Sequence, residues 1–191
     1  MLVFKKKYFL IVENIKDIDL RNIKKRNKFA IIYRNTSKNK QSYELKNFRK
    51  KCKSKSISFF VANNINLAKD LKSDGIYLSA HNLSFKSLNF KRRNFNIIGS
   101  AHNLREINIK KKQGCNYIFF SRLFKVSYKS EKNYLGVLKF NNLVINTFKK
   151  LIPLGGINLS NLGNLKNVNS EYFAIMSEVK KKPAKIFSRL F

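Results

Sequence analysis

Five polar or cationic side chains that suit chemistry on phosphate groups follow short apolar runs of this 191-residue chain. They are Arg34, Ser100, His102, Arg122 and Lys129. Arginine and lysine bind phosphate and diphosphate through charge-assisted hydrogen bonds. Carboxylates are almost absent from the same positions, so the pattern indicates anion binding rather than chemistry by paired acids.

A pair of glycines, Gly155 and Gly156, follows the seventh apolar run, and Ser177 follows the eighth. Glycines let backbone N–H groups approach a ligand closely, and a helix that begins near Asn158 would add the positive end of its dipole. These residues predict a phosphate site. A plain tight turn is the alternative interpretation.

Eight apolar runs alternate with helix-like patterns and must position these side chains. The runs are almost continuously apolar or β-branched, as in strands buried on both faces. They begin near positions 8, 29, 57, 75, 96, 116, 151 and 171. Strands that alternate with helices pair in parallel, and eight such units close into a barrel. We therefore predict a single domain over residues 1–191 with a short (β/α)8 TIM-barrel fold. A doubly wound open sheet is the alternative, because the chain is short for a barrel.

The helical patterns between the runs show clear faces and ends. Leu45, Phe48 and Cys52 fall on one helix face. Asn103 is a predicted N-cap with Glu106 three residues later, and Gly114 ends that helix. In a barrel the site lies in the loops after the strands, and the loops after the seventh and eighth strands commonly hold phosphate.

The charge of the chain is strongly positive, with 41 Lys and Arg against 10 Asp and Glu, a net charge of +31. Such a balance is typical of nucleic-acid binding. The cations occur in nearly every segment, however, so a solvated basic surface is the favoured interpretation and nucleic acid the alternative. Two cysteines are too few for a disulfide framework, which favours a reduced, cytoplasmic setting. No stretch is long and apolar enough to span a membrane.

Several segments, taken in order, resemble consecutive blocks of the thiamine phosphate synthase/TenI superfamily. They are residues 74–78 (DGIYL), 98–104 (IGSAHNL), 114–120 (GCNYIFF), 154–158 (LGGIN) and 174–177 (AIMS). Order and spacing match over roughly residues 57–179, and the first third fits more loosely through Arg34.

The resemblance implies a synthase that joins a pyrimidine methyl diphosphate to a thiazole phosphate and releases diphosphate. It implies that Gly155, Gly156 and Ser177 hold the thiazole phosphate. The other candidates divide into two groups. Arg34, Arg122 and Lys129 are expected to face the diphosphate, and Ser100 and His102 to position the pyrimidine.

The chain also departs from the superfamily pattern. Asn63 and Asn82 stand where the superfamily has two aspartates that bind Mg²⁺. Asparagine offers only a neutral carbonyl, so we expect Mg²⁺ binding to be much weakened, with extra cations after the sixth strand taking over its charge. In the tautomerase branch a histidine after the sixth strand acts as acid and base. Arg122 stands there and cannot lose its proton near neutral pH, which leaves His81 as the spare candidate.

Three hypotheses remain from the sequence. The first is a thiamine phosphate synthase-type transferase acting on phosphorylated small molecules. The second is a barrel that keeps the phosphate site but has lost catalysis and serves a binding or regulatory role. The third is a basic nucleic-acid-binding protein. The oligomeric state is left open.

Overall fold

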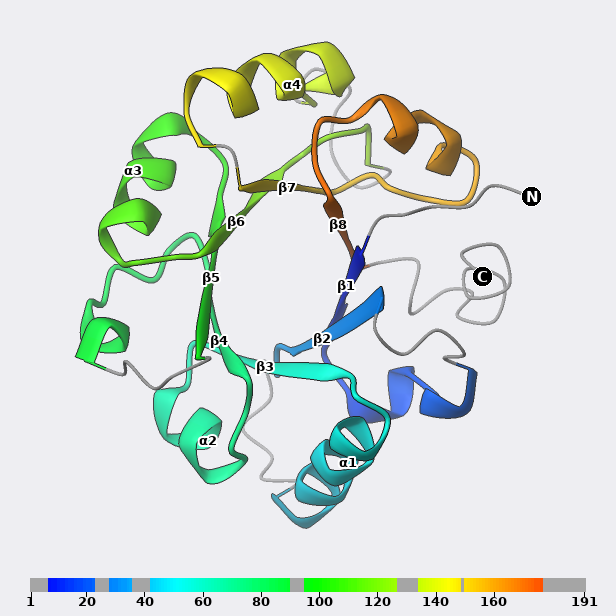
Figure 1. The fold of residues 1–191 in the computed structure, drawn as a ribbon, viewed down its shortest axis with the longest axis vertical. Helices are drawn as coiled ribbons and strands as arrows, with labels where there is room; N and C mark the ends of the chain where they lie inside the picture. Colours follow the sequence, from blue (N-terminus) through cyan, green and yellow to red (C-terminus); the bar gives the residue numbers. More distant parts are fainter. Residues whose placement is uncertain are drawn as a thin grey trace.

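The computed structural model describes residues 7–22, 28–35, 42–89, 95–126, 134–148 and 150–176. Eight parallel strands form a closed barrel in chain order, with each strand hydrogen-bonded to its neighbours in sequence and β8 closing onto β1 (Figure 1). The strands are β1 (Lys7–Val12), β2 (Phe29–Tyr33), β3 (Ser58–Ala62), β4 (Gly75–Leu78), β5 (Asn96–Ala101), β6 (Tyr117–Ser121), β7 (Leu151–Leu154) and β8 (Tyr172–Ile175). The predicted (β/α)8 barrel is confirmed, and the open-sheet alternative is wrong.

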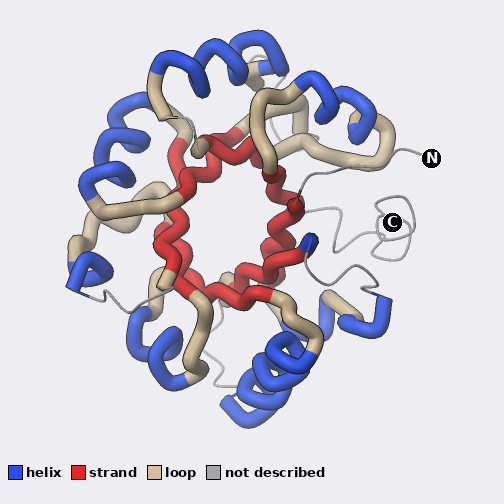
Figure 2. Tube along the Cα trace, in the orientation of Figure 1, coloured by secondary structure: helices blue, strands red, loops and turns tan. Residues whose placement is uncertain are grey.

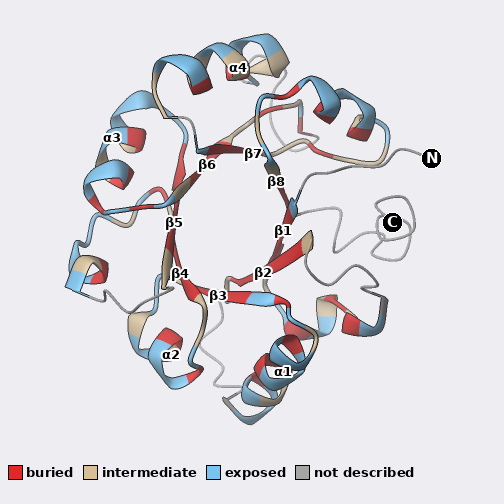
Figure 3. Ribbon diagram, in the orientation of Figure 1, coloured by how far each residue is buried: buried red, intermediate tan, exposed pale blue. Residues whose placement is uncertain are grey.

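The strands are buried on both faces because side chains alternate between the barrel axis and the surrounding helices. One set points inward and packs into the barrel core, which includes Phe9, Ile32, Phe60, Phe119 and Ile152. The other set packs outward against the helices. The ring of strands in Figure 2 therefore encloses packed side chains, and Figure 3 shows the strands largely buried while the outer helix surfaces are exposed.

In the described part of the chain, four α-helices lie outside the barrel: α1 (Ser42–Ser54), α2 (Ile65–Asp70), α3 (Leu104–Lys112) and α4 (Gly136–Asn146). Leu45, Phe48 and Cys52 are buried on the inner face of α1, as their spacing predicts. The predicted cap of α3 is also confirmed, because the Asn103 side chain accepts a hydrogen bond from the Glu106 backbone N–H at 2.9 Å.

Short 3-10 helices stand in other crossovers and make the small barrel possible. They are η1 (Ile15–Asp17), η2 (Leu20–Asn22), η4 (Lys86–Asn89) and η5 (Leu162–Asn167). The prediction of a helix that begins near Asn158 is wrong, because η5 begins at Leu162. The Asn158 carboxamide oxygen accepts hydrogen bonds from the N–H and hydroxyl of Ser160, which forms a turn in place of a helical start. Among the described residues no helix is long and apolar enough to cross a membrane.

We predict that Gly75→Ala destabilises the barrel. A Cβ at Gly75 would collide with the Asn96 carbonyl on β5 and lie 2.7 Å from the Phe60 ring. Overpacking of this kind typically costs about 1–3 kcal/mol, which lowers the melting temperature by about 2–4 °C for each kcal/mol at this chain length. Gly163→Ala is the control, because nothing lies within 4 Å of its Cβ position. Equal melting temperatures for the two variants would contradict the close approach of β4 and β5.

Candidate functional site

A cavity of about 480 Å³ opens at the carboxyl ends of the strands, where sites of parallel barrels lie. It brings together six of the eight predicted site residues. They are Arg34 after β2, Ser100 and His102 on and after β5, Arg122 after β6, and Gly155 and Gly156 after β7. The other two, Lys129 and Ser177, lie outside the described residues. These six residues therefore line one cavity, and their roles stay predictions.

The glycine pair forms a tight, open-faced loop. Gly155 has a φ of +91° and Gly156 a φ of +72°, in the region that favours glycine. A Cβ on Gly156 would collide with the Phe124 carbonyl, so this position has no room for a side chain. The described residues supply no hydrogen-bond acceptor for the backbone N–H groups of these two glycines. Successive N–H groups without an internal partner can donate hydrogen bonds to an anion in the cavity.

The residues after β6 pack directly on the glycine loop. Leu123 donates a backbone hydrogen bond to the Leu154 carbonyl at 3.0 Å, and Phe124 donates one to the Gly155 carbonyl at 3.1 Å. The Arg122 side chain lies against Gly155, because a Cβ there would be 3.0 Å from Arg122 Cγ. Within the described part of the chain, the Arg122 guanidinium has no ion-pair partner. Its charge is thus available beside the glycine N–H groups.

Arg34, by contrast, is already paired. Its Nη2 lies 2.9 Å from the Glu13 carboxylate and 3.5 Å from the Met176 sulfur. Its Nε is buried and has no hydrogen-bond partner within the described residues. The Glu13 carboxylate therefore neutralises part of the charge of this guanidinium.

The two histidines of the chain stack at the cavity rim, with ring centroids 6.5 Å apart. His102 Nδ1 lies 3.0 Å from a Glu106 carboxylate oxygen, which also accepts the His102 backbone N–H at 2.7 Å. Partial burial alone would raise the pKa of Glu106, but these hydrogen bonds hold it below its usual value. The carboxylate favours the tautomer with the proton on Nδ1 and so leaves Nε2 as an acceptor.

Several cavity residues have no role in the sequence prediction. Ser79 and Ser121 follow their strands at the rim but are not among the predicted site residues, His81 is only a spare candidate, and Tyr77 and Met176 were missed. Burial raises the pKa of Tyr77, against the effects of its hydrogen bond with Ser100 and of the Arg34 charge, so its hydroxyl keeps the proton. The alternation of side chains along β4 could have found Tyr77, because it stands two residues before Ser79, which directly follows the strand.

The two asparagines at the expected metal positions bond to each other. Asn63 Oδ1 accepts hydrogen bonds from Asn82 Nδ2 at 3.0 Å and from the Ser79 backbone N–H at 2.9 Å. Asn82 Oδ1 accepts the Ser84 backbone N–H at 2.9 Å. Both amide oxygens are therefore engaged, and no carboxylate joins them among the described residues. Because Mg²⁺ prefers anionic oxygen ligands, this donor set does not fit the ion.

A buried lysine holds the loop that carries this amide pair. Lys110 is fully buried, and its ammonium donates to the Asn82 carbonyl at 2.7 Å and to Gln113 at 2.9 Å. Gln113, also fully buried, donates to the carbonyls of Asn82 and Ser84. Burial lowers the pKa of Lys110. The end of α3 thus anchors the loop after β4 through these hydrogen bonds. The contact joins residues far apart in the chain and has no local sequence signal.

Fold and site together define a (β/α)8 barrel. Its cavity at the carboxyl ends of the strands is lined by cationic side chains and by backbone N–H groups that suit an anion. A family model described as thiamine monophosphate synthase matches residues 5–179, so this chain belongs to that family. The thiamine-phosphate synthase of Prochlorococcus marinus subsp. pastoris is 34% identical over 129 residues, which cover 67% of this chain and 37% of that protein. Another, from Prochlorococcus marinus, is 28% identical over 145 residues, which cover 75% of this chain and 42% of that protein.

The fold also has a close counterpart among solved structures. Thiamine phosphate pyrophosphorylase from Pyrococcus furiosus superposes with a TM-score of 0.73 and covers 98% of both chains, at 19% identity. At that identity the likeness concerns the fold. The matched region spans about two fifths of the length of the two Prochlorococcus relatives.

We predict that restoring carboxylates creates a Mg²⁺ site. The double variant Asn63→Asp, Asn82→Asp is expected to gain about 1.4 kcal/mol of stability when Mg²⁺ stands at ten times its dissociation constant, a rise of about 3–6 °C in melting temperature. The unmodified chain is expected to show no such rise. Asn108→Asp, Asn164→Asp adds the same charge at exposed positions and is the control. A Mg²⁺-dependent rise in the unmodified chain would contradict the fit argument.

Proposed function

We propose that this chain is a transferase of the thiamine phosphate synthase type, which joins hydroxymethylpyrimidine diphosphate to a thiazole phosphate. The observation that carries the proposal is the glycine loop. Gly155 and Gly156 line the same cavity as Arg122, and within the described residues neither their backbone N–H groups nor the Arg122 guanidinium has a partner. Membership of the family supports the substrate class.

The thiazole phosphate binds to Gly155 and Gly156, with Ser177 completing the site. Backbone N–H groups bind a phosphate without adding a charged side chain that would compete with the second substrate. Because Gly156 has no room for a Cβ, the phosphate can approach the backbone itself.

The diphosphate of the pyrimidine substrate faces Arg122, Lys129 and Arg34. The thiazole nitrogen forms a bond to the pyrimidine methylene carbon, while the bond from that carbon to the diphosphate oxygen breaks and its electron pair leaves with the diphosphate. Cations that are already in position stabilise this leaving charge without reorganisation. Arg34 contributes less than Arg122, because Glu13 neutralises part of its charge.

Ser100 and His102 position the pyrimidine. The Glu106 carboxylate fixes the His102 ring, and Tyr77 holds the Ser100 hydroxyl. A ring held by two such residues keeps the reacting carbon in line with the thiazole nitrogen, which is the geometric part of catalysis. The proposal needs no step through Mg²⁺ and places the reaction in the cytoplasm.

A second candidate is a barrel that binds the phosphorylated thiazole without catalysis. The amide pair of Asn63 and Asn82 and the partial neutralisation of Arg34 favour it, because both reduce the charge available to a leaving diphosphate.

A product assay separates the two candidates. The full chain is supplied with both substrates, once with Mg²⁺ and once with EDTA. We expect thiamine phosphate in both reactions, because cationic side chains replace the metal. Product only with Mg²⁺ would contradict metal independence but support the transferase. Thiazole phosphate binding without product would favour the second candidate, and loss of both would exclude the two together.

Two substitutions test the roles of the cavity residues. Gly156→Asp is expected to abolish saturable binding of thiazole phosphate, since the side chain collides with Phe124 and repels the phosphate. Gly136→Asp is its control, because that glycine also has a positive φ, of +74°, and has nothing within 4 Å. Arg122→Gln is expected to lower the rate on the order of 10²–10³-fold with little effect on thiazole phosphate binding. Full activity of Arg122→Gln would remove this residue from the mechanism.

A further inference from the structure

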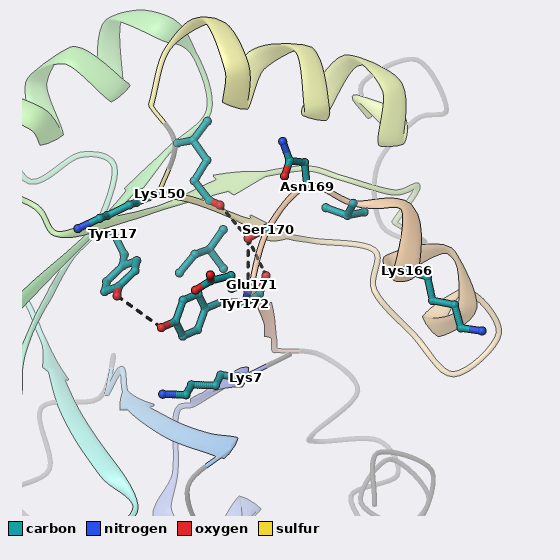
Figure 4. A pocket seen from close by; sticks show the side chains of 11 residues that line it. Lys7, Tyr117, Lys150, Lys166, Asn169, Ser170, Glu171 and Tyr172 are labelled. Carbon is teal, nitrogen blue, oxygen red and sulfur yellow. Dashed lines mark hydrogen bonds between the residues drawn. The ribbon is translucent and has the colours of Figure 1, made fainter. Parts of the chain in front are cut away.

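A second cavity lies at the opposite, amino-terminal mouth of the barrel. It has a volume of about 760 Å³ and lies between the beginnings of β1, β6, β7 and β8 (Figure 4). Its polar lining includes Lys7, Tyr117, Lys150, Lys166, Glu171 and Tyr172. A smaller hollow that shares Lys7, Tyr117 and Tyr172 extends it toward Lys28 on the neighbouring strand. The proposed transferase reaction uses none of these residues.

The register of the strands directs three lysines to this mouth. Phe9, Ala30 and Ile152 pack in the barrel core, and inward-facing positions recur every second residue. The residues two positions earlier are Lys7, Lys28 and Lys150. Tyr8 pairs with Phe29, so Lys7 at the start of β1 and Lys28 directly before β2 lie next to each other, on strands about 4.8 Å apart.

The mouth offers few negative charges in return. Glu171 is the one carboxylate in the described lining of the larger cavity, against the ammonium groups of Lys7, Lys150 and Lys166. In the described part of the chain neither Lys7 nor Lys150 forms an ion pair. Figure 4 shows these two lysines extending toward the side on which the tyrosine hydroxyls lie, whereas Lys166 points away. The Lys150 ammonium lies 5.7 Å from the centre of the Tyr117 ring.

Two tyrosines form the floor between these lysines. The hydroxyls of Tyr117 and Tyr172 lie 3.5 Å apart, and their rings meet edge to face at 5.1 Å. Burial raises the pKa of Tyr172 to about 12, so its hydroxyl keeps its proton and can donate to an anion. Phe9 packs beneath, with its ring 5.8 Å from that of Tyr172 and 5.1 Å from that of Phe119. This aromatic layer separates the mouth from the cavity at the other end.

We infer that the amino-terminal mouth is a second anion site, in which Lys7, Lys28 and Lys150 bind a compact polyphosphate group and the tyrosine hydroxyls donate to it. The ligand class comprises free diphosphate and the phosphate end of a nucleotide. A single phosphate would leave much of the lysine charge unpaired, whereas two linked phosphates reach lysines on different strands. The inference does not depend on the proposed reaction.

Titration calorimetry with pyrophosphate on the full chain tests this site. The double variant Gly156→Asp, Arg122→Gln disrupts both the phosphate and the diphosphate positions of the first cavity, and we expect it to retain one saturable pyrophosphate site per chain. Adding Lys7→Gln and Lys150→Gln is expected to weaken that binding at least tenfold. The control adds Lys46→Gln and Lys53→Gln, which remove the same charge from the exposed surface of α1. We expect this control to bind as the Gly156→Asp, Arg122→Gln variant does.

The outcomes separate this site from diffuse charge and from the first cavity. Equal losses in the mouth variant and the control would overturn the inference, as would loss of all pyrophosphate binding in the Gly156→Asp, Arg122→Gln variant alone. Binding of ADP as tight as that of pyrophosphate would support the site as one for nucleotides, and preference for pyrophosphate would support it as one for free diphosphate. A single-stranded oligonucleotide whose affinity grows with length and exceeds that of ADP would overturn the inference in favour of nucleic acid.

Discussion

Closure of eight parallel strands determines the direction of every strand side chain in this molecule. In a closed barrel a residue points to the axis or to the helices according to its place in the strand, and strand pairing on both sides prevents a shift of register. Along β2 and the residues that flank it, the side chains that point inward are those of Lys28, Ala30, Ile32 and Arg34. This one row of alternate residues therefore supplies a cation to each mouth of the barrel and apolar groups to the core between them. Both anion sites follow from this geometry.

The shortage of carboxylates determines the electrostatics of both sites. The chain has ten Asp and Glu, and several of those described are committed to structural contacts. The relevant pairs are Glu13 with Arg34, Asp74 with Arg49 and Glu106 with His102. The cavity at the carboxyl ends of the strands consequently lacks the anionic oxygens that a hard cation needs, yet it carries cations and N–H donors in excess. In the proposed function such a cavity binds phosphates directly, without a metal between protein and ligand.

Local patterns predicted most of the fold. Each of the eight apolar runs is a strand, and the Asn103 cap begins α3, because strand burial and helix capping depend on neighbours in sequence. The position of Gly155 and Gly156 at the cavity followed from strand order alone. The failures involve partners that side chains select in three dimensions. The helix expected near Asn158 is replaced by a side-chain turn. The pairing of Glu13 with Arg34 and the anchoring of Asn82 by Lys110 have no local signature.

Charge is distributed unevenly around the cavity at the carboxyl ends of the strands. This uneven charge bears on whether the barrel catalyses a reaction or only binds a ligand. Asn63 and Asn82, which bond to each other, line a neighbouring hollow and add no charge to this cavity, whereas its β6–β7 side combines Arg122 with the glycine N–H groups. A thiazole phosphate on the glycine loop adds negative charge to the side on which the diphosphate must also bind. Two anions at such close range repel each other unless cations stand between them. Arg122 lies against Gly155 and is the described cation best placed to separate the two, so the proposed catalysis depends on this residue and on the lysines that follow it in the chain.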